Sequence, residues 1–399
     1  DRRKIITDLE SLKVAVRTVP SLAELISDQK KMTDLQELSI DDILPGARIS
    51  NTEVSEASSK TFFVSGAGGS IGAEITRQLL VGNPKKIILF ELSEYSLFQI
   101  QRECKAIIDS KDLDTSIIPI LGDIRDQKNL NYIFKKFQVD HIYHAAAYKH
   151  VPIVEDENNL SIAAENNILG TYNLAQTAVE NSVQSFVMIS TDKAVRPTNI
   201  MGATKRFAEI IIQSINASTD VTRFSMVRFG NVINSSGSVI PLFLDQISHG
   251  GPVTVTDKNV MRYFMTIPEA SSLVIQAGEM SNGGEVFILD MGEQIKIYDL
   301  AKKLIHLSGR NYIEADGQPD DGIQILEVGL RPGEKMYEEL LISGSEIKTD
   351  NPKIFKANES FIQPNQLLPI LEQMKESINN YDNNEILNLL VQNVEGFER

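Results

Sequence analysis

From residue 61 onward, short apolar runs alternate with segments whose apolar residues follow the period of a helix. The apolar runs occupy residues 61–64, 86–90, 116–121, 141–144, 185–189 and 223–229. Nearly continuous apolar strands that are separated by helices are typical of a parallel sheet covered on both faces. The alternation therefore predicts an α/β fold with a doubly wound parallel sheet.

A glycine-rich turn follows the first of these strands and opens a helix expected over 71–80. In a Rossmann fold, Gly66 would permit a tight turn, Gly69 a close approach to a pyrophosphate, and Gly72 close packing of helix on strand. The spacing is Gly-x-x-Gly-x-x-Gly, and a glycine triplet alone is also compatible with a turn that binds no ligand. Its position after the first strand favours a Rossmann-type dinucleotide site that includes Ser70 and Ile71.

Further cofactor-binding residues are expected where the next strands end, because ligands bind at the carboxyl ends of parallel strands. Glu91, 19 residues after Gly72, would accept hydrogen bonds from the adenosine ribose and repel a 2′-phosphate, which favours NAD over NADP. Asp123 is expected near the adenine amine. The full additional set is Glu91, Ser93, Asp123, Ile124, Ala145, Ala146 and Ala147.

A polar loop follows the fifth strand and carries Thr191, Asp192 and Lys193 in succession, with Met201 and Lys205 shortly after. The loop offers a hydroxyl, an acid and an amine, and its position predicts that it faces the nicotinamide. A charged turn on the surface is the structural alternative. We favour catalysis because several strand ends converge on the same edge of the sheet.

The length of 399 residues allows two or three domains. We expect residues 1–57 to be the remnant of a preceding domain plus a linker, with a helix, a strand at 14–17 and a helix after Pro20. Residues 58–234 form the Rossmann domain, to which residues of about 262–295 return. The returning segment carries a helical pattern at 268–280. A smaller substrate-binding part comprises 235–261 and 296–361, with a helical pattern at 297–308, and a helical segment covers 362–399.

Composition excludes several classes of function. The net charge of −15 argues against a nucleic-acid partner, because neutralising phosphates needs a surplus of Lys and Arg. Cys104 is the one cysteine, and the five histidines lack metal-ligand spacing, so no metal site is expected. No apolar run reaches the length of a membrane-spanning helix. Because the chain begins at Asp1, we expect a fragment of a longer protein.

Residues 61–345 resemble the bacterial UDP-N-acetylglucosamine 4,6-dehydratases, which are extended short-chain dehydrogenases/reductases of the polysaccharide-biosynthesis type. The matching stretches are 66–72, 145–152 (AAAYKHVP), 190–206 (STDKAVRPTNIMGATKR), 228–243 (RFGNVINSSGSVIPLF), 262–270 (RYFMTIPEA) and 329–341 (GLRPGEKMYEELL). The first 57 residues are similar to the tail of the N-terminal region in long, membrane-anchored members. The resemblance implies an NAD-dependent hydro-lyase on the cytoplasmic side of the bacterial inner membrane, a homo-oligomer that acts in surface-glycan synthesis or protein glycosylation.

In the reaction implied by this resemblance, hydride leaves C4 of the sugar, water is eliminated across C5 and C6, and the hydride returns to C6. The resemblance makes Lys193 the base at C5, Asp192 the acid for the C6 hydroxyl, and Thr191 the relay for the C4 hydroxyl proton. Lys193 must be neutral to act as a base. Lys205 would hold the nicotinamide ribose.

Met201 is a departure from the common Tyr-x-x-x-Lys pattern, because methionine cannot exchange a proton. The long dehydratases with Met here are similar, and the resemblance associates Met with retention of the C5 configuration.

The substrate's diphosphate requires cations and N–H donors. Arg262 and Arg331 are expected to bind it with Asn231, and Glu334 to contact the uridine ribose or orient Arg331. The other residues expected to bind UDP-GlcNAc are Lys149, near the sugar, and Ser238, Val239, Val253 and Val255, near the uracil.

Two alternatives stay open. A UDP-GlcNAc 4-epimerase shares the oxidation at C4 but needs no acid and base for elimination, so Asp192 and Lys193 favour dehydration. A non-catalytic NAD-binding sensor or scaffold is suggested by Met201, and the intact set of Thr191, Asp192, Lys193 and Lys205 argues against it.

Overall fold

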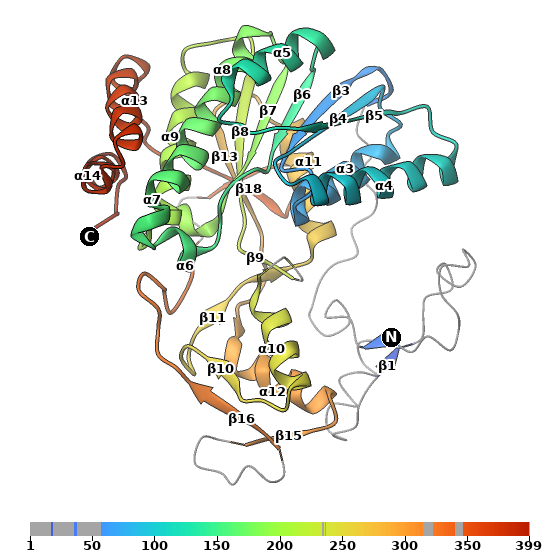
Figure 1. The fold of residues 1–399 in the computed structure, drawn as a ribbon, viewed down its shortest axis with the longest axis vertical. Helices are drawn as coiled ribbons and strands as arrows, with labels where there is room; N and C mark the ends of the chain where they lie inside the picture. Colours follow the sequence, from blue (N-terminus) through green and yellow to red (C-terminus); the bar gives the residue numbers. More distant parts are fainter. Residues whose placement is uncertain are drawn as a thin grey trace. The chain divides into compact units, whose positions relative to one another are not determined.

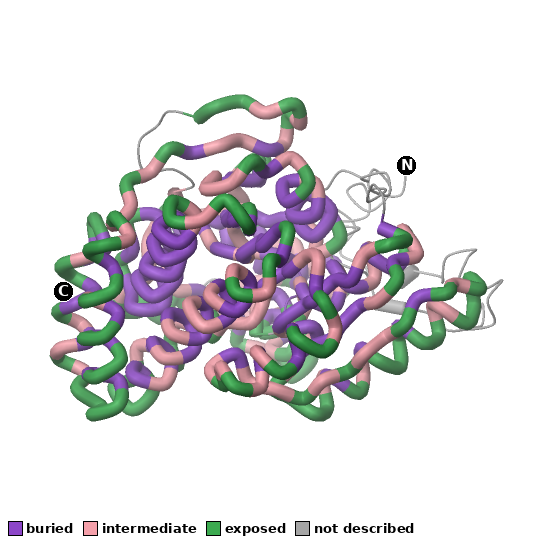
Figure 2. Tube along the Cα trace, turned by 90° about the horizontal axis from the view of Figure 1, so that it is seen from above, coloured by how far each residue is buried: buried purple, intermediate pink, exposed green. Residues whose placement is uncertain are grey.

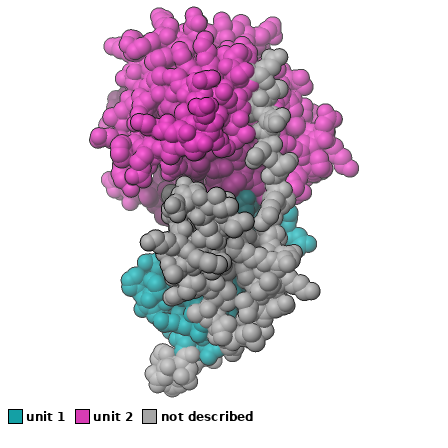
Figure 3. Space-filling model, turned by 90° about the vertical axis from the view of Figure 1, so that its right-hand side faces the viewer, with its two compact units in different colours: residues 1–48, 231–266, 292–337 teal, residues 49–230, 267–291, 338–399 magenta. Residues whose placement is uncertain are grey.

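The computed structural model describes residues 17–18, 36–37, 57–233, 235, 237–313, 322–339 and 346–398. The chain divides into two compact units, coloured separately in Figure 3. Unit 1 comprises residues 1–48, Asn231–Thr266 and Gly292–Tyr337; unit 2 comprises Ile49–Gly230, Ile267–Met291 and Glu338–Arg399. The helices predicted within residues 1–57, and most of the strand predicted at 14–17, lie outside the described residues. The strands β1 (Arg17–Thr18) and β2 (Gln36–Glu37) form an antiparallel pair there.

Unit 2 is built on a sheet that has nine strands among the described residues (Figure 1). Seven neighbouring strands are parallel, in the order β13 (Glu285–Leu289), β8 (Arg223–Arg228), β7 (Ser185–Ile189), β6 (His141–His144), β3 (Thr61–Ser65), β4 (Lys86–Glu91) and β5 (Ser116–Leu121). In chain order, the strands are added from β3 through β4 to β5 on one side of the sheet, and then from β6 onward on the other side of β3. This change of side between β3 and β6 is typical of a Rossmann fold. The predicted α/β class and doubly wound sheet are therefore confirmed.

Burial explains why these runs form strands. Every residue of β3 is buried, as are the four central residues of β4, whereas β5 at the sheet edge is partly exposed. Apolar side chains on both faces of a strand require a cover on both faces. Figure 2 shows buried positions in the interior and exposed positions on the outer sides of the helices.

Two groups of helices supply this cover (Figure 1). In one group, α3 contacts both α4 and α11; in the other, α8 contacts both α5 and α9. Their bounds are α3 (Ser70–Val81), α4 (Glu94–Lys111), α11 (Ile267–Glu279), α5 (Gln127–Phe137), α8 (Thr171–Glu180) and α9 (Ile200–Asn216). Shorter helical segments are η2 (Ala57–Ser59), α6 (Val151–Val154), α7 (Glu157–Ala164), the π-helix η3 (Glu165–Gly170) and η4 (Asp192–Ala194).

The C-terminal segment is part of unit 2. β18 (Ile354–Ala357) pairs antiparallel with β13, and β17 (Ile347–Lys348) pairs with β18. Helices α13 (Pro364–Asn379) and α14 (Asn383–Asn393) both contact α9, which is buried along almost its whole length. The boundary that we predicted at 361 therefore lies at 337/338, because strand pairing joins residues after 338 to the Rossmann sheet.

Unit 1 contains a parallel three-stranded sheet in the order β10 (Val253–Val255), β16 (Gly322–Glu327) and β15 (Asn311–Ile313). Helices α10 (Val239–Ser248) and α12 (Ile297–Leu307) pack on it around an apolar core. Two short ladders complete the unit: β9 (Asn231–Val232) with β12 (Phe264–Met265), and β11 (Met261–Arg262) with β14 (Ile295–Lys296).

From residue 61 onward, the predicted strands and helices agree with the structure, apart from small shifts at their ends. Strand β13 was missed, although it lies inside the segment predicted to return to the Rossmann domain, which the structure places at Ile267–Met291. No helix in the described part of the chain is long and apolar enough to cross a membrane.

Candidate active site

The glycine turn forms a compact cradle at the start of α3. Gly66 has a φ of +66°, and the Gly69 N–H donates to the Gly66 carbonyl at 3.0 Å. A Cβ on Gly72 would lie 2.1 Å from the Gly66 oxygen, so a larger residue would push the helix away from the turn. Ser70 and Ile71 begin α3, whose first N–H groups suit a bound phosphate. This geometry fits the predicted pyrophosphate site.

Glu91 is tied to the glycine turn in a way that the sequence did not reveal. Its two carboxylate oxygens accept the N–H groups of Gly68 and Ser93, each at 3.0 Å. Ser93 in turn caps α4 by accepting the Ser96 N–H at 3.3 Å. A Cβ on Gly68 would lie 2.5 Å from the Ser96 Cβ, so Gly68 is a further residue of the cradle that we missed. The contact of Glu91 with a ribose stays a prediction.

The carboxylate of Asp123 is occupied by an arginine. Arg125 donates to both of its oxygens, with Nη2 at 2.5 Å, and also reaches Glu165 at 2.9 Å. Burial opposes ionisation, but the hydrogen bonds from Arg125 outweigh it and lower the pKa of Asp123. A carboxylate has further acceptor positions beside those that Arg125 uses, so the contact of Asp123 with an adenine amine stays a prediction. Ile124 is buried, and its side chain packs against Gly170.

The ends of β3 and β6 are joined beneath the turn. The Ala145 N–H donates to the Ser65 carbonyl at 3.0 Å, and a Cβ on Gly66 would lie 2.7 Å from the Ala146 nitrogen. Ala145, Ala146 and Ala147 thus lie beside or just after the contact with the turn, in agreement with the need for small side chains. His144, which we did not single out, bonds Ser65 Oγ at 2.7 Å, and burial lowers its pKa to about 3.

The three polar residues after β7 form one hydrogen-bonded group. Asp192 Oδ1 accepts from Thr191 Oγ1 at 2.8 Å and from Lys193 Nζ at 3.0 Å. The Asp192 side chain is fully buried, and its Oδ2 has no hydrogen-bond partner among the described residues. A buried carboxylate oxygen without a partner is costly unless a ligand or water donates a hydrogen bond to it.

The hydrogen bonds at Asp192 Oδ1 bring together all three residues predicted for proton transfer.

Glu338 is a second carboxylate at Lys193. Its Oε1 lies 3.5 Å from Lys193 Nζ, and its side chain is 4% exposed. Sequence reasoning missed Glu338, although it lies in the conspicuous stretch 329–341. Opposite charges favour the ammonium form of a lysine, so two carboxylates oppose the neutral form that a base requires.

The first turns of helix α9 pack against the loop of Thr191, Asp192 and Lys193. Its N-cap Asn199 accepts the Gly202 N–H at 2.8 Å. A Cβ on Gly202 would lie 2.2 Å from the Lys193 carbonyl oxygen, so only glycine allows this close approach. Met201 is buried, and Lys205, one turn later, donates to the Ile189 carbonyl at 2.8 Å. Lys205 is thus held at the end of β7, just before the loop, and its contact with a nicotinamide ribose stays a prediction.

Lys205 is buried, and its titration tests that burial. Desolvation lowers its pKa from 10.5 to about 8, with Glu209 opposing the shift. Between these pH values the unfolded chain binds a proton that the folded chain lacks, so the free energy of unfolding should rise with pH. Urea denaturation from pH 7 to 10 should show this rise in the ligand-free protein, and Lys205→Met should lose it. Identical pH slopes would contradict the burial of Lys205.

In unit 1, Glu334 connects the two predicted phosphate-binding arginines. Its Oε1 accepts from Arg262 Nη2 at 3.0 Å and from Thr256 Oγ1 at 3.1 Å. Its Oε2 accepts the backbone N–H of Arg331 at 3.2 Å. Arg262 is buried and Arg331 is exposed. Glu334 therefore holds the Arg262 side chain and the Arg331 backbone, and its predicted contact with the uridine ribose or the Arg331 side chain stays a prediction.

The remaining predicted substrate residues are spread over both units. Asn231 begins β9, and Ser238 and Val239 stand at the start of α10. Val253 and Val255 are buried in β10, and the Val255 carbonyl already accepts the Val328 N–H at 2.9 Å. Lys149 lies after β6 in unit 2; it is exposed, although desolvation lowers its pKa. Their contacts with a substrate stay predictions.

No group of three or more His, Cys, Asp or Glu residues in the described ranges could hold a metal ion.

Comparison with known proteins places this geometry in a family. Residues 62–359 match the model of a family described as "Polysaccharide biosynthesis protein". The chain belongs to this family. It is 44% identical over 376 residues to the capsular polysaccharide biosynthesis protein CapD of Staphylococcus aureus, covering 93% of this chain and 60% of that protein. It thus spans less than two thirds of that relative's length.

A second relative of this chain carries the name of an enzyme reaction. A UDP-N-acetylglucosamine 4,6-dehydratase (inverting) of Campylobacter jejuni is 33% identical over 288 residues, covering 71% of this chain and 78% of that protein.

Solved structures share the extended Rossmann fold. Pen from Bacillus thuringiensis matches with a TM-score of 0.66 and 35% identity, over 77% of this chain and 92% of that one. A UDP-glucose 4-epimerase of Thermus thermophilus in complex with NAD matches with a TM-score of 0.56 and 18% identity, over 71% and 90% of the two chains.

Proposed function

We propose that this polysaccharide biosynthesis protein is an NAD-dependent UDP-GlcNAc 4,6-dehydratase. The observation that carries the proposal is Asp192 Oδ1, which accepts hydrogen bonds from both Thr191 and Lys193. Elimination of water needs a base and an acid close together, and this group supplies both beside a relay hydroxyl. The likeness to a named dehydratase supports the choice of reaction.

The glycine cradle and Glu91 would hold NAD, with Lys205 at its nicotinamide ribose. When bound, NAD would accept the hydride from C4 of the sugar and give it back to C6. The small alanines and the close turn support a dinucleotide at this edge of the sheet. Glu91 favours NAD over NADP because its carboxylate would repel a 2′-phosphate.

The proton transfers close into a cycle on Thr191, Asp192 and Lys193. The C4 hydroxyl proton passes through Thr191 to Asp192 along the existing 2.8 Å hydrogen bond. Neutral Lys193 takes the C5 proton, and Asp192 protonates the departing C6 hydroxyl, which leaves as water. Lys193 then returns its proton to C5, so all three residues regain their starting states. Because Asp192 and Glu338 favour the ammonium form, loss of a proton from Lys193 must precede the reaction.

Met201 supports retention of the C5 configuration as part of the proposal. Without a tyrosine at this position, Lys193 is the residue that both removes and returns the C5 proton. Return by the same residue to the same face of the sugar retains the configuration.

The test is incubation of the protein with UDP-GlcNAc and NAD, followed by NMR of the sugar. We expect the 4-keto-6-deoxy product with retained C5 configuration. The C4 epimer would indicate an epimerase, and an inverted C5 would overturn the stereochemical assignment. Absence of any turnover, with NAD bound, would favour a sensor or scaffold.

We further propose that Arg262, Arg331 and Asn231 of unit 1 bind the diphosphate. Arg331→Ala should raise KM for UDP-GlcNAc about 10–100-fold, since a charge-assisted hydrogen bond contributes about 1.5–3 kcal/mol. Arg310→Ala is the matched control, because Arg310 is also exposed in unit 1. Steady-state kinetics and melting temperature check both variants. An unchanged KM in Arg331→Ala would remove Arg331 from the substrate site.

A further inference from the structure

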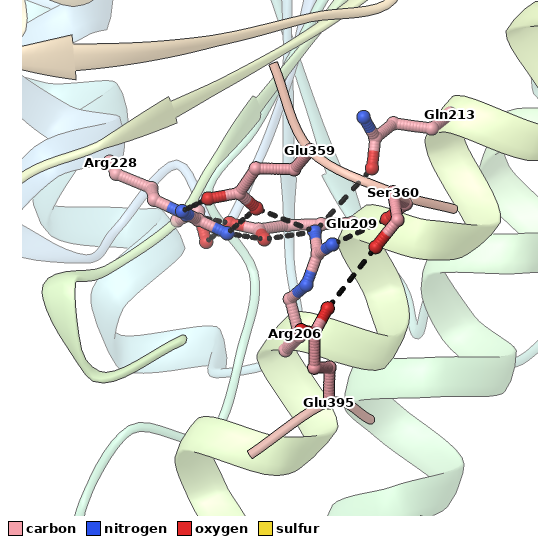
Figure 4. Close-up of polar contacts among 8 residues, drawn as sticks. Arg206, Glu209, Gln213, Arg228, Glu359, Ser360 and Glu395 are labelled. Atoms are coloured by element: carbon pink, nitrogen blue, oxygen red, sulfur yellow. Dashed lines mark hydrogen bonds and ion pairs between the residues drawn. The ribbon is translucent and has the colours of Figure 1, made fainter. Parts of the chain in front are cut away.

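Figure 4 shows a group of buried charges that includes Arg206, Glu209, Arg228 and Glu359. A hydrogen bond from Ser190 joins this group to the catalytic loop, residues 190–193. Glu209 of α9 and Arg228 of β8 are both 0% exposed. Arg228 Nε donates to Glu209 Oε1 at 2.8 Å, and Nη2 donates to Glu209 Oε2. Burying two charges is costly unless their geometry is good and their other atoms are bonded. The fork-to-fork pairing of guanidinium and carboxylate meets that requirement.

The group is electrically balanced by a second pair. Glu359, between β18 and α13, accepts from Arg228 at 2.5 and 2.6 Å, and its Oε2 lies 3.1 Å from Arg206 Nη1. Arg206 also donates to Glu209 at 3.1 Å and to the Ser360 carbonyl at 2.7 Å. Two arginines thus face two glutamates. Arg228 and Arg206 lower the pKa of Glu209 despite the opposing effect of burial, which keeps it ionised.

Ser190 connects this group to the catalytic loop. Its hydroxyl donates to Glu209 Oε1 at 2.5 Å, the same oxygen that accepts Arg228 Nε. The loop backbone is joined to β8 on both sides of Arg228: the Ser190 N–H donates to Val227 at 2.8 Å, and the Asp192 N–H donates to Phe229 at 3.1 Å. The side-chain and backbone contacts therefore fix Ser190, the residue immediately before Thr191, to one point of the core.

We propose that Ser190, Glu209 and Arg228 are positioning residues that hold the catalytic loop in its reactive geometry. This inference rests on the proposed function only where it concerns turnover. None of the three contacts the reacting atoms in the mechanism above. They act through Thr191, Asp192 and Lys193, whose alignment tolerates little displacement, because proximity effects are steep in distance. Glu359 and Arg206 keep the charge of the network balanced.

Ser190→Ala removes the side-chain link between the loop and Glu209 but leaves the backbone bonds to β8 and the Glu209–Arg228 pair. We expect kcat for dehydration to fall about tenfold with KM within about twofold, as a misaligned loop slows chemistry more than binding. Hydrogen–deuterium exchange followed by mass spectrometry should show faster exchange in peptides that contain the Ser190 and Asp192 amides. Ser225→Ala is the matched control: Ser225 is a buried serine of β8 whose hydroxyl has no partner among the described residues.

The two readouts separate this inference from the proposed function. Faster exchange in the loop together with a lower kcat, at the melting temperature of the control, supports it. If the loop of Ser190→Ala exchanges as slowly as that of Ser225→Ala, the positioning role is overturned, whatever happens to kcat. Faster exchange in Ser190→Ala with an unchanged kcat also overturns it. If the wild-type protein does not convert UDP-GlcNAc, the proposed function fails, and the exchange measurement still decides whether Ser190 holds the loop.

Discussion

Replacing Lys193 by alanine is expected to lower kcat for dehydration of UDP-GlcNAc by about 10²–10⁴-fold, the usual contribution of general acid–base catalysis. Without the amine, no neighbouring group in the proposed cycle removes the C5 proton. NAD should stay bound, because Lys193 is not part of the glycine cradle. Product formation by NMR and the NAD content of the purified protein measure the two effects.

Lys193→Arg distinguishes a lost base from a lost ion pair. Arginine keeps a positive charge for Asp192 and Glu338 but does not deprotonate in proteins. We therefore expect Lys193→Arg to be as inactive as Lys193→Ala while retaining more of the wild-type stability. Lys85→Ala, an exposed lysine of unit 2, is the control and should keep full activity. Turnover by Lys193→Arg near the wild-type rate would show that Lys193 is not the base.

Arg228→Leu is expected to lower the free energy of unfolding by about 3–5 kcal/mol, the range found when one partner of a buried ion pair is removed. Glu209 and Glu359 would then share the single charge of Arg206 in a region that water does not reach. Urea denaturation at pH 7 measures the loss. Arg228→Leu with Glu359→Gln should be more stable than Arg228→Leu alone, because the charge is balanced again.

The control for this prediction is Arg77→Leu. Arg77 also pairs with two carboxylates, Glu74 and Glu103, but its side chain is 34% exposed. Exposed ion pairs contribute about 0–1 kcal/mol, so this variant should be nearly as stable as the wild type. Equal losses in Arg77→Leu and Arg228→Leu would contradict the burial of the network.

Apolar runs and the glycine turn predicted the central strands of the sheet and the first helix. The strands from β3 to β8 and helix α3 follow from apolar runs and a glycine turn, because both are read within a few residues. The loop of Thr191, Asp192 and Lys193 was found for the same reason. A helical segment was expected over 362–399, and it forms α13 and α14. A helical pattern does not show which surface a helix packs on, and here both helices contact α9.

Residues that act through long-range pairing could not be found in this way. Glu338 and Glu359 lie far along the chain from Lys193 and Arg228, which they meet in the folded protein. Glu359 follows β18, which pairs with β13 of the sheet. The pairing of Arg125 with Asp123 could not be foreseen either, because the position of Asp123 after a strand does not show which side chain packs against it. Position along the chain predicts which residues reach the edge of the sheet, whereas their partners depend on packing.

The most direct test of the central claim uses UDP-GlcNAc that carries deuterium at C4. If dehydration proceeds by hydride transfer from C4 to C6, NMR and mass spectrometry should find the label in the C6 methyl group of the 4-keto product. Loss of the label to solvent, or a C4 epimer as the sole product, would contradict the account.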